Sequence, residues 1–306
     1  MLDLQINYNN CMKNLIIALL LFLGLDAFAD DKIKFVLKSN PKITADYKGK
    51  IKDGKANGVG KAVFYLDGEF DGEYEGEWKE NDFHGDGTFI WKNGSKYIGE
   101  FEYSRRNGIG EYNWPNGNKY VGDWKNNIQH GKGTHLWVNG EQYEGTYING
   151  QQTGYGIYSW PNGNKYEGYW LDGKQHGEGI FTWITGDKYI GNFVNEIRTG
   201  YGTFYWANGN IYQGNWENNK QNGQGIKKWT NGNVYSGSWT NDNFHGSGTY
   251  TWEDGEKFTG EFQNGQRNGY GKLILANGNV QEGLYVNDVL QKNSAKTLTT
   301  ASTTLN

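Results

Sequence analysis

Cysteine, proline, aliphatic residues and clustered positive charge are scarce in this 306-residue chain. The single cysteine, Cys11, excludes a disulfide within the chain. Only 36% of the residues are hydrophobic, too few for a helical bundle or for the aliphatic runs that a doubly wound α/β enzyme buries. The formal net charge is −4 without a dense Lys/Arg stretch, which excludes the basic face that nucleic-acid binding requires.

Glycine and aromatic residues are instead abundant. The chain has 47 glycines, 22 tyrosines, 14 phenylalanines and 13 tryptophans, against three prolines. Large flat side chains must therefore supply the core, and the glycines indicate frequent turns and close backbone approaches. This composition predicts an all-β protein.

The amino terminus has the pattern of an export signal. Lys13 precedes an apolar run over residues 15–25, and Ala27-Phe28-Ala29 forms a small-x-small cleavage site before Asp30. The run is too short to span a bilayer, which takes about 20 residues. We interpret residues 1–29 as a signal peptide, with Met12 as an alternative start and an uncleaved anchor as the alternative to cleavage. An exported chain would reside in the periplasm or cell envelope, or be secreted.

An internal repeat of 23 residues dominates the rest of the sequence. Its first aromatic recurs without insertion at Tyr74, Tyr97, Tyr120, Tyr143, Tyr166, Tyr189, Tyr212, Tyr235 and Phe258. An earlier copy starts at Tyr47 and carries four extra residues near Phe70. We assign residues 47–285 to ten repeats plus a half copy, 30–46 to an N-terminal capping segment, and 286–306 to a disordered polar tail.

One copy shows the motif in full. Tyr120-Val121-Gly122-Asp123-Trp124 is followed by His130-Gly131-Lys132-Gly133. This pattern, Y-x-G-x-W-x6-G-x-G, resembles the MORN repeat family (membrane occupation and recognition nexus). The resemblance implies a meandering antiparallel sheet that serves as a scaffold, often near membranes, and it implies no single activity.

The turns set the strand register. Pro115 and Gly117 favour a three-residue loop that pairs Trp114 with Asn118. On the other side of the repeat, a four-residue loop would pair Phe101 with Gly108 and keep the tyrosines on one face. We therefore predict an elongated, twisted, single-layer antiparallel meander of 23-residue β-hairpins, about 100 Å long at the usual strand spacing.

In this register glycines form one row across the sheet and aromatic rings form the next, so that rings can lie over bare backbone. The other face carries lysines before the repeat aromatic, Lys96, Lys119, Lys165, Lys188 and Lys257, with acids such as Glu100, Asp123 and Glu261. We expect that face to be polar and solvated.

No constellation indicates catalysis, a cofactor or a metal. Four histidines share one repeat position, His84, His130, His176 and His245. Neighbours in that set lie two or more repeats apart, at least roughly 19 Å at the strand spacing, whereas zinc ligands sit about 2 Å from the ion. The G-x-G pairs lie within strands and lack the Lys-Ser/Thr of a phosphate loop.

The aromatic row is either a core alone or also an interaction surface. Its candidate surface residues are Phe89, Tyr97, Tyr112, Tyr120, Tyr143, Tyr158, Tyr166, Trp114, Trp137 and Trp160. We expect a non-catalytic scaffold that binds a protein partner, or self-associates through the edge strands at the two ends of its sheet. Direct binding of lipid headgroups or of an envelope polysaccharide is the alternative, although the acidic chain lacks a polybasic patch for anionic lipid.

Overall fold

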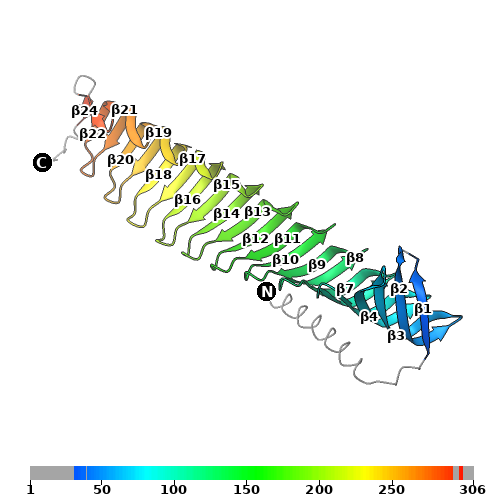
Figure 1. The fold of residues 1–306 in the computed structure, drawn as a ribbon. Coiled ribbons are helices and arrows are strands. Elements are labelled where there is room, and N and C mark those ends of the chain that lie inside the picture. The colour runs from blue at the N-terminus through cyan, green and yellow to red at the C-terminus, as the bar shows by residue number, and fades with distance from the viewer. Residues whose placement is uncertain (1–30, 39, 292–295, 299–306) are drawn as a thin grey trace. The chain divides into compact units, whose positions relative to one another are not determined.

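The computed structural model describes residues 31–38, 40–291 and the backbone of 296–298. The predicted signal peptide and residues 299–306 of the predicted tail lie outside the described residues. The chain divides between Gln151 and Gln152 into two compact units. In each unit, consecutive strands pair antiparallel as hairpins (Figure 1), which confirms the all-β meander.

The strands of unit 1 are β1 (Lys32–Leu37), β2 (Asn40–Lys52), β3 (Lys55–Leu66), β4 (Glu69–Lys79), β5 (Asp82–Trp91), β6 (Lys96–Glu102), β7 (Arg105–Asn113), β8 (Lys119–Lys125), β9 (Ile128–Leu136) and β10 (Gln142–Ile148). Those of unit 2, whose first strand starts at the boundary, are β11 (Gln151–Ser159), β12 (Lys165–Leu171), β13 (Lys174–Thr182), β14 (Lys188–Val194), β15 (Ile197–Tyr205), β16 (Ile211–Glu217), β17 (Lys220–Lys228), β18 (Val234–Thr240), β19 (Asn243–Thr251), β20 (Lys257–Gln263), β21 (Gln266–Ile274), β22 (Val280–Val286), β23 (Val289–Leu290) and β24 (Lys296–Leu298).

The loop between repeats has the predicted register. The Trp114 backbone N–H donates to the Asn118 carbonyl at 2.9 Å, and Tyr112 pairs with Tyr120. Gly117 has a φ of 91°, a left-handed conformation that glycine adopts without a Cβ penalty. We call this side of each sheet the loop edge.

The turn within each repeat differs from the prediction. Phe101 pairs with Arg106 rather than with Gly108, so the expected four-residue loop is wrong. Tyr103 and Ser104 form a two-residue turn with φ values of 48° and 58°, the left-handed pair that a type I′ turn needs. A bulge opposite Glu100 places two extra residues in β7. Because that number is even, the side chains beyond the bulge stay on the predicted faces of the sheet. Tyr97 therefore still pairs with Tyr112.

The glycine row and the rings above it form as predicted. Gly99 pairs with Gly110, and Gly110 with Gly122. The Tyr97 ring lies over Gly110 so closely that a Cβ there would collide with its hydroxyl. That hydroxyl donates to the Glu100 carbonyl at 3.0 Å, a group that the bulge leaves unpaired in the ladder. The Tyr97 side chain is consequently both fully buried and hydrogen-bonded.

Side chains also join successive hairpins at both edges. At the edge opposite the loops, the turn edge, Asn127 Oδ1 accepts the Arg106 N–H at 2.9 Å while the Asn127 N–H donates to the Arg106 carbonyl at 3.0 Å. At the loop edge, Asn118 Oδ1 accepts the Val138 N–H at 3.0 Å. These edge clasps explain why asparagine recurs in both kinds of turn.

Both ends of the repeat array carry extra strands. At the beginning, β1 pairs with β2, and its Phe35 packs edge-on against Trp78 with ring centroids 6.0 Å apart. At the end, β23 and β24 pair with β22. The tail expected to be disordered from residue 286 therefore begins with strand pairing, because β22 would otherwise leave its backbone groups unpaired.

The face opposite the aromatic rings, here called the outer face, matches the sequence prediction only in part. In unit 1 Glu100 and Asp123 accept backbone N–H groups of the bulges at 3.0 and 2.8 Å, although Ile109 on the same face is 40% exposed. In unit 2 the outer face carries Tyr169 and Tyr201, which are 51% and 56% exposed. The expected polar, solvated face is thus wrong for part of unit 2, because several variable positions that are charged in unit 1 are aromatic or aliphatic there.

Candidate functional site

The structure separates the ten candidate surface residues into two groups. The tyrosines that lie over the glycine row are fully buried, at 0% exposure: Tyr97, Tyr120, Tyr143 and Tyr166. Phe89 is also buried, at 8%. The other five are half-buried: Tyr112, Tyr158, Trp114, Trp137 and Trp160. The first group therefore forms the core, and only the second presents ring edges at the surface.

The half-buried rings belong to a continuous stack along the loop edge of each unit, which we call the aromatic ladder. In unit 1 its members are Phe89, Trp91, Tyr112, Trp114, His135 and Trp137, with successive ring centroids 4.2 to 5.4 Å apart. In unit 2 they are Tyr158, Trp160, Phe181, Trp183, Phe204, Trp206, Lys227, Trp229, Tyr250 and Trp252, with successive ring centroids 4.4 to 5.6 Å apart on either side of Lys227.

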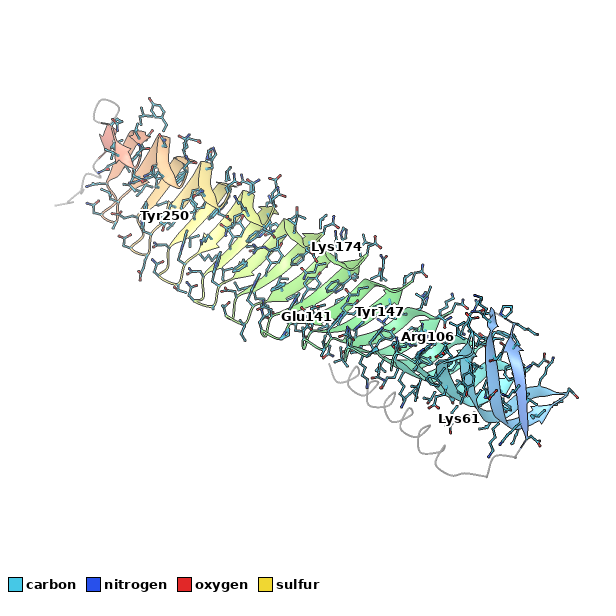
Figure 2. The ribbon with its side chains drawn as sticks, in the orientation of Figure 1. Lys61, Arg106, Glu141, Tyr147, Lys174 and Tyr250 are labelled. Carbon is cyan, nitrogen blue, oxygen red and sulfur yellow. The ribbon has the colours of Figure 1, made fainter. Side chains whose placement is uncertain are left out.

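The repeat itself builds this ladder. After Trp91, each tryptophan of the ladder directly follows a strand, and most lie two residues after an aromatic, as in Tyr112 and Trp114, whose centroids are 4.6 Å apart. The tryptophan of one loop also reaches the ring of the next hairpin, as Trp91 reaches Tyr112 at 5.4 Å. In unit 2, Tyr250 lies toward the loop edge and Lys174 at the turn edge (Figure 2). Stacked rings fix the exposed edges in place, so the ladder is a preorganised apolar surface.

His135 occupies a ladder position that holds phenylalanine or tyrosine in most other repeats. Its ring is parallel to those of Trp114 and Trp137, with interplanar angles of 8° and centroid distances of 5.1 and 4.2 Å. The buried Nε2 has no hydrogen-bond partner. Burial lowers the pKa of His135 to about 4, because the charged imidazolium would lose its hydration.

We expect the fold to lose stability in mild acid through His135. The unfolded histidine takes up a proton near pH 6.5 and the folded one only near 4. The stability it contributes is therefore complete above pH 6.5 and is lost as the pH falls toward 4. The test variant is His135→Tyr, because the neighbouring repeats carry tyrosine at this position. Its melting temperature should exceed that of the wild type by on the order of a few degrees more at pH 4.5 than at pH 7. His130→Asn is the control, and an equal acid response in both variants would contradict the prediction.

Lys227 occupies the same repeat position as His135 and is the one ladder member without an aromatic ring. Its Nζ lies 4.7 Å from the Trp206 ring centroid and 5.3 Å from that of Trp229. Burial lowers the pKa of Lys227, and Asp242 partly opposes that effect. A cation between two indoles keeps the spacing of the stack while contributing a cation–π interaction.

A second layer, not predicted from the sequence, covers the buried tyrosines. The Arg106 guanidinium lies 4.3 Å from the Trp124 ring and 4.9 Å from the Tyr112 ring. Figure 2 labels Arg106 on the strands of unit 1. Arg198 is held in the same way, 4.7 Å from Trp216. This repeat position, two residues before the first glycine of G-x-G, holds Phe, Arg or Gln in every copy after the first, which has Ala56, and that restriction was the available sequence signal.

The residues that the structure describes include no group of three His, Cys, Asp or Glu side chains that could hold a metal ion. His84, His130, His176 and His245 each lie at the bulge strand of a different hairpin. Within the same described residues, no helix is long and apolar enough to cross a membrane.

Two solved structures to which the chain is similar share low identity and a low TM-score with it. The SAS-4 TCP domain of Drosophila melanogaster, in complex with a proline-rich motif of Ana2, is 14% identical over 49% of this chain and 81% of its own, with a TM-score of 0.33. A catalytically inactive virginiamycin B lyase from Staphylococcus aureus with quinupristin is 13% identical over 84% of this chain and 86% of its own, with a TM-score of 0.15. No curated protein matches the chain by sequence.

The family comparison is decisive. The MORN repeat profile matches ten segments, residues 47–65, 74–96, 97–119, 120–142, 143–165, 166–188, 189–211, 212–234, 235–257 and 258–280. These segments account for well over half of the sequence and follow the hairpins of the fold. The chain belongs to the MORN repeat family.

Proposed function

We propose that this chain is a non-catalytic scaffold of the cell envelope that binds an apolar, extended segment of a protein partner along its aromatic ladder. The half-buried ladder carries the proposal, because it presents ring edges at regular spacing on a rigid sheet. Contiguous apolar surface of this kind on a soluble protein usually marks an interaction site. The loops beside it offer exposed asparagine amides, such as those of Asn116 and Asn162, for backbone groups of a bound segment.

Charge favours a protein partner over anionic lipid. The repeat lysines, such as Lys96 and Lys119, precede the buried tyrosines and therefore point to the outer face, away from the ladder. Lys119 is moreover paired with Glu111 at 2.7 Å. A lipid surface would have to engage the outer face, where unit 1 also carries acids.

Removal of two ladder indoles should abolish partner binding. Trp160→Leu with Trp183→Leu keeps an apolar residue, and Leu275 already occupies this repeat position, so the fold should persist. We expect the wild-type chain to capture a protein from the envelope fraction. The affinity of the ladder variant for that protein should be at least about tenfold lower, as for interface tryptophans that act as hot spots. Tyr270→Ala, at an exposed outer-face residue, is the matched control.

Liposomes and purified envelope polysaccharide test the alternatives in parallel. At about 150 mM salt, where the Debye length is roughly 8 Å, we expect no saturable binding to anionic vesicles. Binding to vesicles that depends on Lys96, Lys119, Lys165 and Lys188, or binding to polysaccharide that depends on the ladder, would replace the protein-partner proposal.

Export is tested at the amino terminus. We expect the mature protein to begin at Asp30, because Ala27 and Ala29 provide the small residues that signal peptidase requires. Amino-terminal sequencing of the exported protein checks this. Retention of Lys13 in the mature product would instead indicate an uncleaved anchor.

A further inference from the structure

The outer face of unit 2 carries an apolar patch that neither the ladder nor the core explains. Its residues, here called the outer patch, are Tyr155, Leu171, Tyr169, Ile180, Ile190, Val194, Ile197, Tyr201 and Ile226, each 37 to 56% exposed. They extend over neighbouring strands, since Tyr155 pairs with Tyr169 and Ile180 pairs with Ile190. Exposure of so many large apolar side chains on adjacent strands is typical of a face that packs against another surface.

The outer patch is richer in large apolar side chains than the same positions of unit 1, which are partly apolar and partly charged. One repeat position holds Asp86, Ile109 and Lys132 in unit 1, and Tyr155, Glu178 and Tyr201 in unit 2. Other positions of the unit 1 outer face hold acids, including Glu75, Glu77, Glu100, Glu111, Asp123 and Glu144. Contact between two copies of the unit 1 outer face would therefore remove more charged groups from water than contact between two outer patches.

The few charges of the outer patch suit contact with an identical patch. Glu167 is already paired within the chain, accepting from Lys165 Nζ and from the Tyr155 hydroxyl, each at 3.0 Å. Glu178 remains exposed between the lysines Lys174 and Lys188 of the same and the next strand. In a dimer with a two-fold axis, the same patch of each copy contacts that of the other. The Glu178 carboxylate of one copy can then face a lysine of the other.

Size and shape also favour a second copy. The patch extends from Tyr155 on β11 to Ile226 on β17, six strand spacings, and over about seven residues along the strands, or about 29 by 23 Å at the usual spacings. That is about 670 Å² on each copy and about 1,300 Å² in all, within the range of specific interfaces. Two identical sheets have the same twist, which is the condition for aligned face-to-face packing at about 30°.

We propose that the outer patch of unit 2 packs against the outer patch of a second copy of this chain, forming a two-fold dimer. Tyr169, Ile190 and Tyr201 lie in its interior, and Lys174 and Lys188 lie toward its rim. The ladder is on the other face of the sheet and stays free in such a dimer, so this inference does not depend on the proposed partner binding.

Light scattering of the full mature chain over a range of concentrations tests the dimer. We expect twice the chain mass for the wild type, and a dissociation constant more than about 100-fold higher for Ile190→Lys with Tyr201→Lys, because like charges across an interface oppose association. The repeat tolerates lysine there, since Lys132 occupies the position of Tyr201 in unit 1. At concentrations low enough that both are monomeric, thermal melts of the variant and the wild type should coincide.

The chain supplies its own control. Ile98 and Ile109 occupy the same repeat positions as Ile190 and Tyr201, but in unit 1. Ile98→Lys with Ile109→Lys should leave the dimer intact. Mixing the lysine patch variant with Ile190→Glu plus Tyr201→Glu should restore dimers between the two variants. A wild-type chain that is monomeric throughout, a dimer that survives the patch variant, or a mixture that stays monomeric would overturn the proposal.

Discussion

Replacing Gly122 with valine should destabilise unit 1 by about 3 kcal/mol, the upper part of the range for overpacking. A Cβ at Gly122 would collide with the Lys132 carbonyl, and it would lie 2.5 Å from the Gly133 Cα and 2.8 Å from the Tyr120 hydroxyl. Backbone of a paired strand cannot withdraw without breaking the ladder. Valine's better strand propensity, within a scale of about 1 kcal/mol, cannot offset this.

A thermal or denaturant melt measures the effect. Gly255→Ala is the control, because a Cβ there meets nothing within 4 Å and only the left-handed φ of 87° opposes it. We expect a loss of about 1 kcal/mol in the control. An unchanged or raised stability of Gly122→Val would show that the rings do not lie over the glycine row.

The second large effect is expected in alkali, where the fold should unfold cooperatively between about pH 10 and 12. Burial raises the pKa of Tyr47 and of Tyr189 to about 12. Burial also raises the pKa values of the other tyrosines in the row, Tyr74, Tyr97, Tyr120, Tyr143, Tyr166, Tyr212 and Tyr235. The neutral hydroxyl is the form that donates to a backbone carbonyl, as Tyr189 does to Asn192 at 3.3 Å.

The sign follows from the proton balance. Between the unfolded pKa of about 10 and the folded pKa, only the folded tyrosine keeps its proton, so stability falls as the pH rises. In that window each such tyrosine lowers the free energy of unfolding by about 1.4 kcal/mol per pH unit. The effects of the tyrosines in the row add together. Below pH 10 the contribution is complete.

Tyrosinate absorbance and circular dichroism should change together in an alkaline titration. Tyr189→Phe mimics the repeat that carries Phe258 and should make the transition shallower by about one proton. Ionisation of the buried tyrosines while the circular dichroism stays native would contradict the prediction.

The glycine row and the loop edge were predictable because each rests on a local rule. Pro115 and Gly117 specify their loop, and a period of two then carries the register to Tyr112 and Tyr120. The turn edge was not predictable by the same reasoning. A four-residue loop and a two-residue turn plus a two-residue bulge give the same parity, so the alternation of faces cannot distinguish them. The Asn126-Asn127 pair was the neglected signal, since both residues tolerate positive φ.

Burial within the aromatic face could not be read from spacing. Tyr97 and Tyr112 pair directly and share a face, yet one is fully buried and the other half-buried. The difference arises because the Tyr97 ring lies over Gly110 and packs edge-on against Phe101, whereas Tyr112 stacks toward the tryptophans of the loop edge. Ring orientation depends on neighbours in three different hairpins, and a single repeat does not encode it.

The edge clasps have a consequence for how such a chain can change its length. At each turn edge from Asn81 to Asp288, a backbone N–H of the turn donates to a carbonyl of the preceding hairpin, as Asn127 donates to Arg106. Gene duplication or loss of one whole repeat therefore recreates this contact, while an insertion of another length displaces it. Each such event changes the length of the sheet by about 9.6 Å, which is two strand spacings. Evolution can therefore adjust the distance that the protein spans in discrete steps.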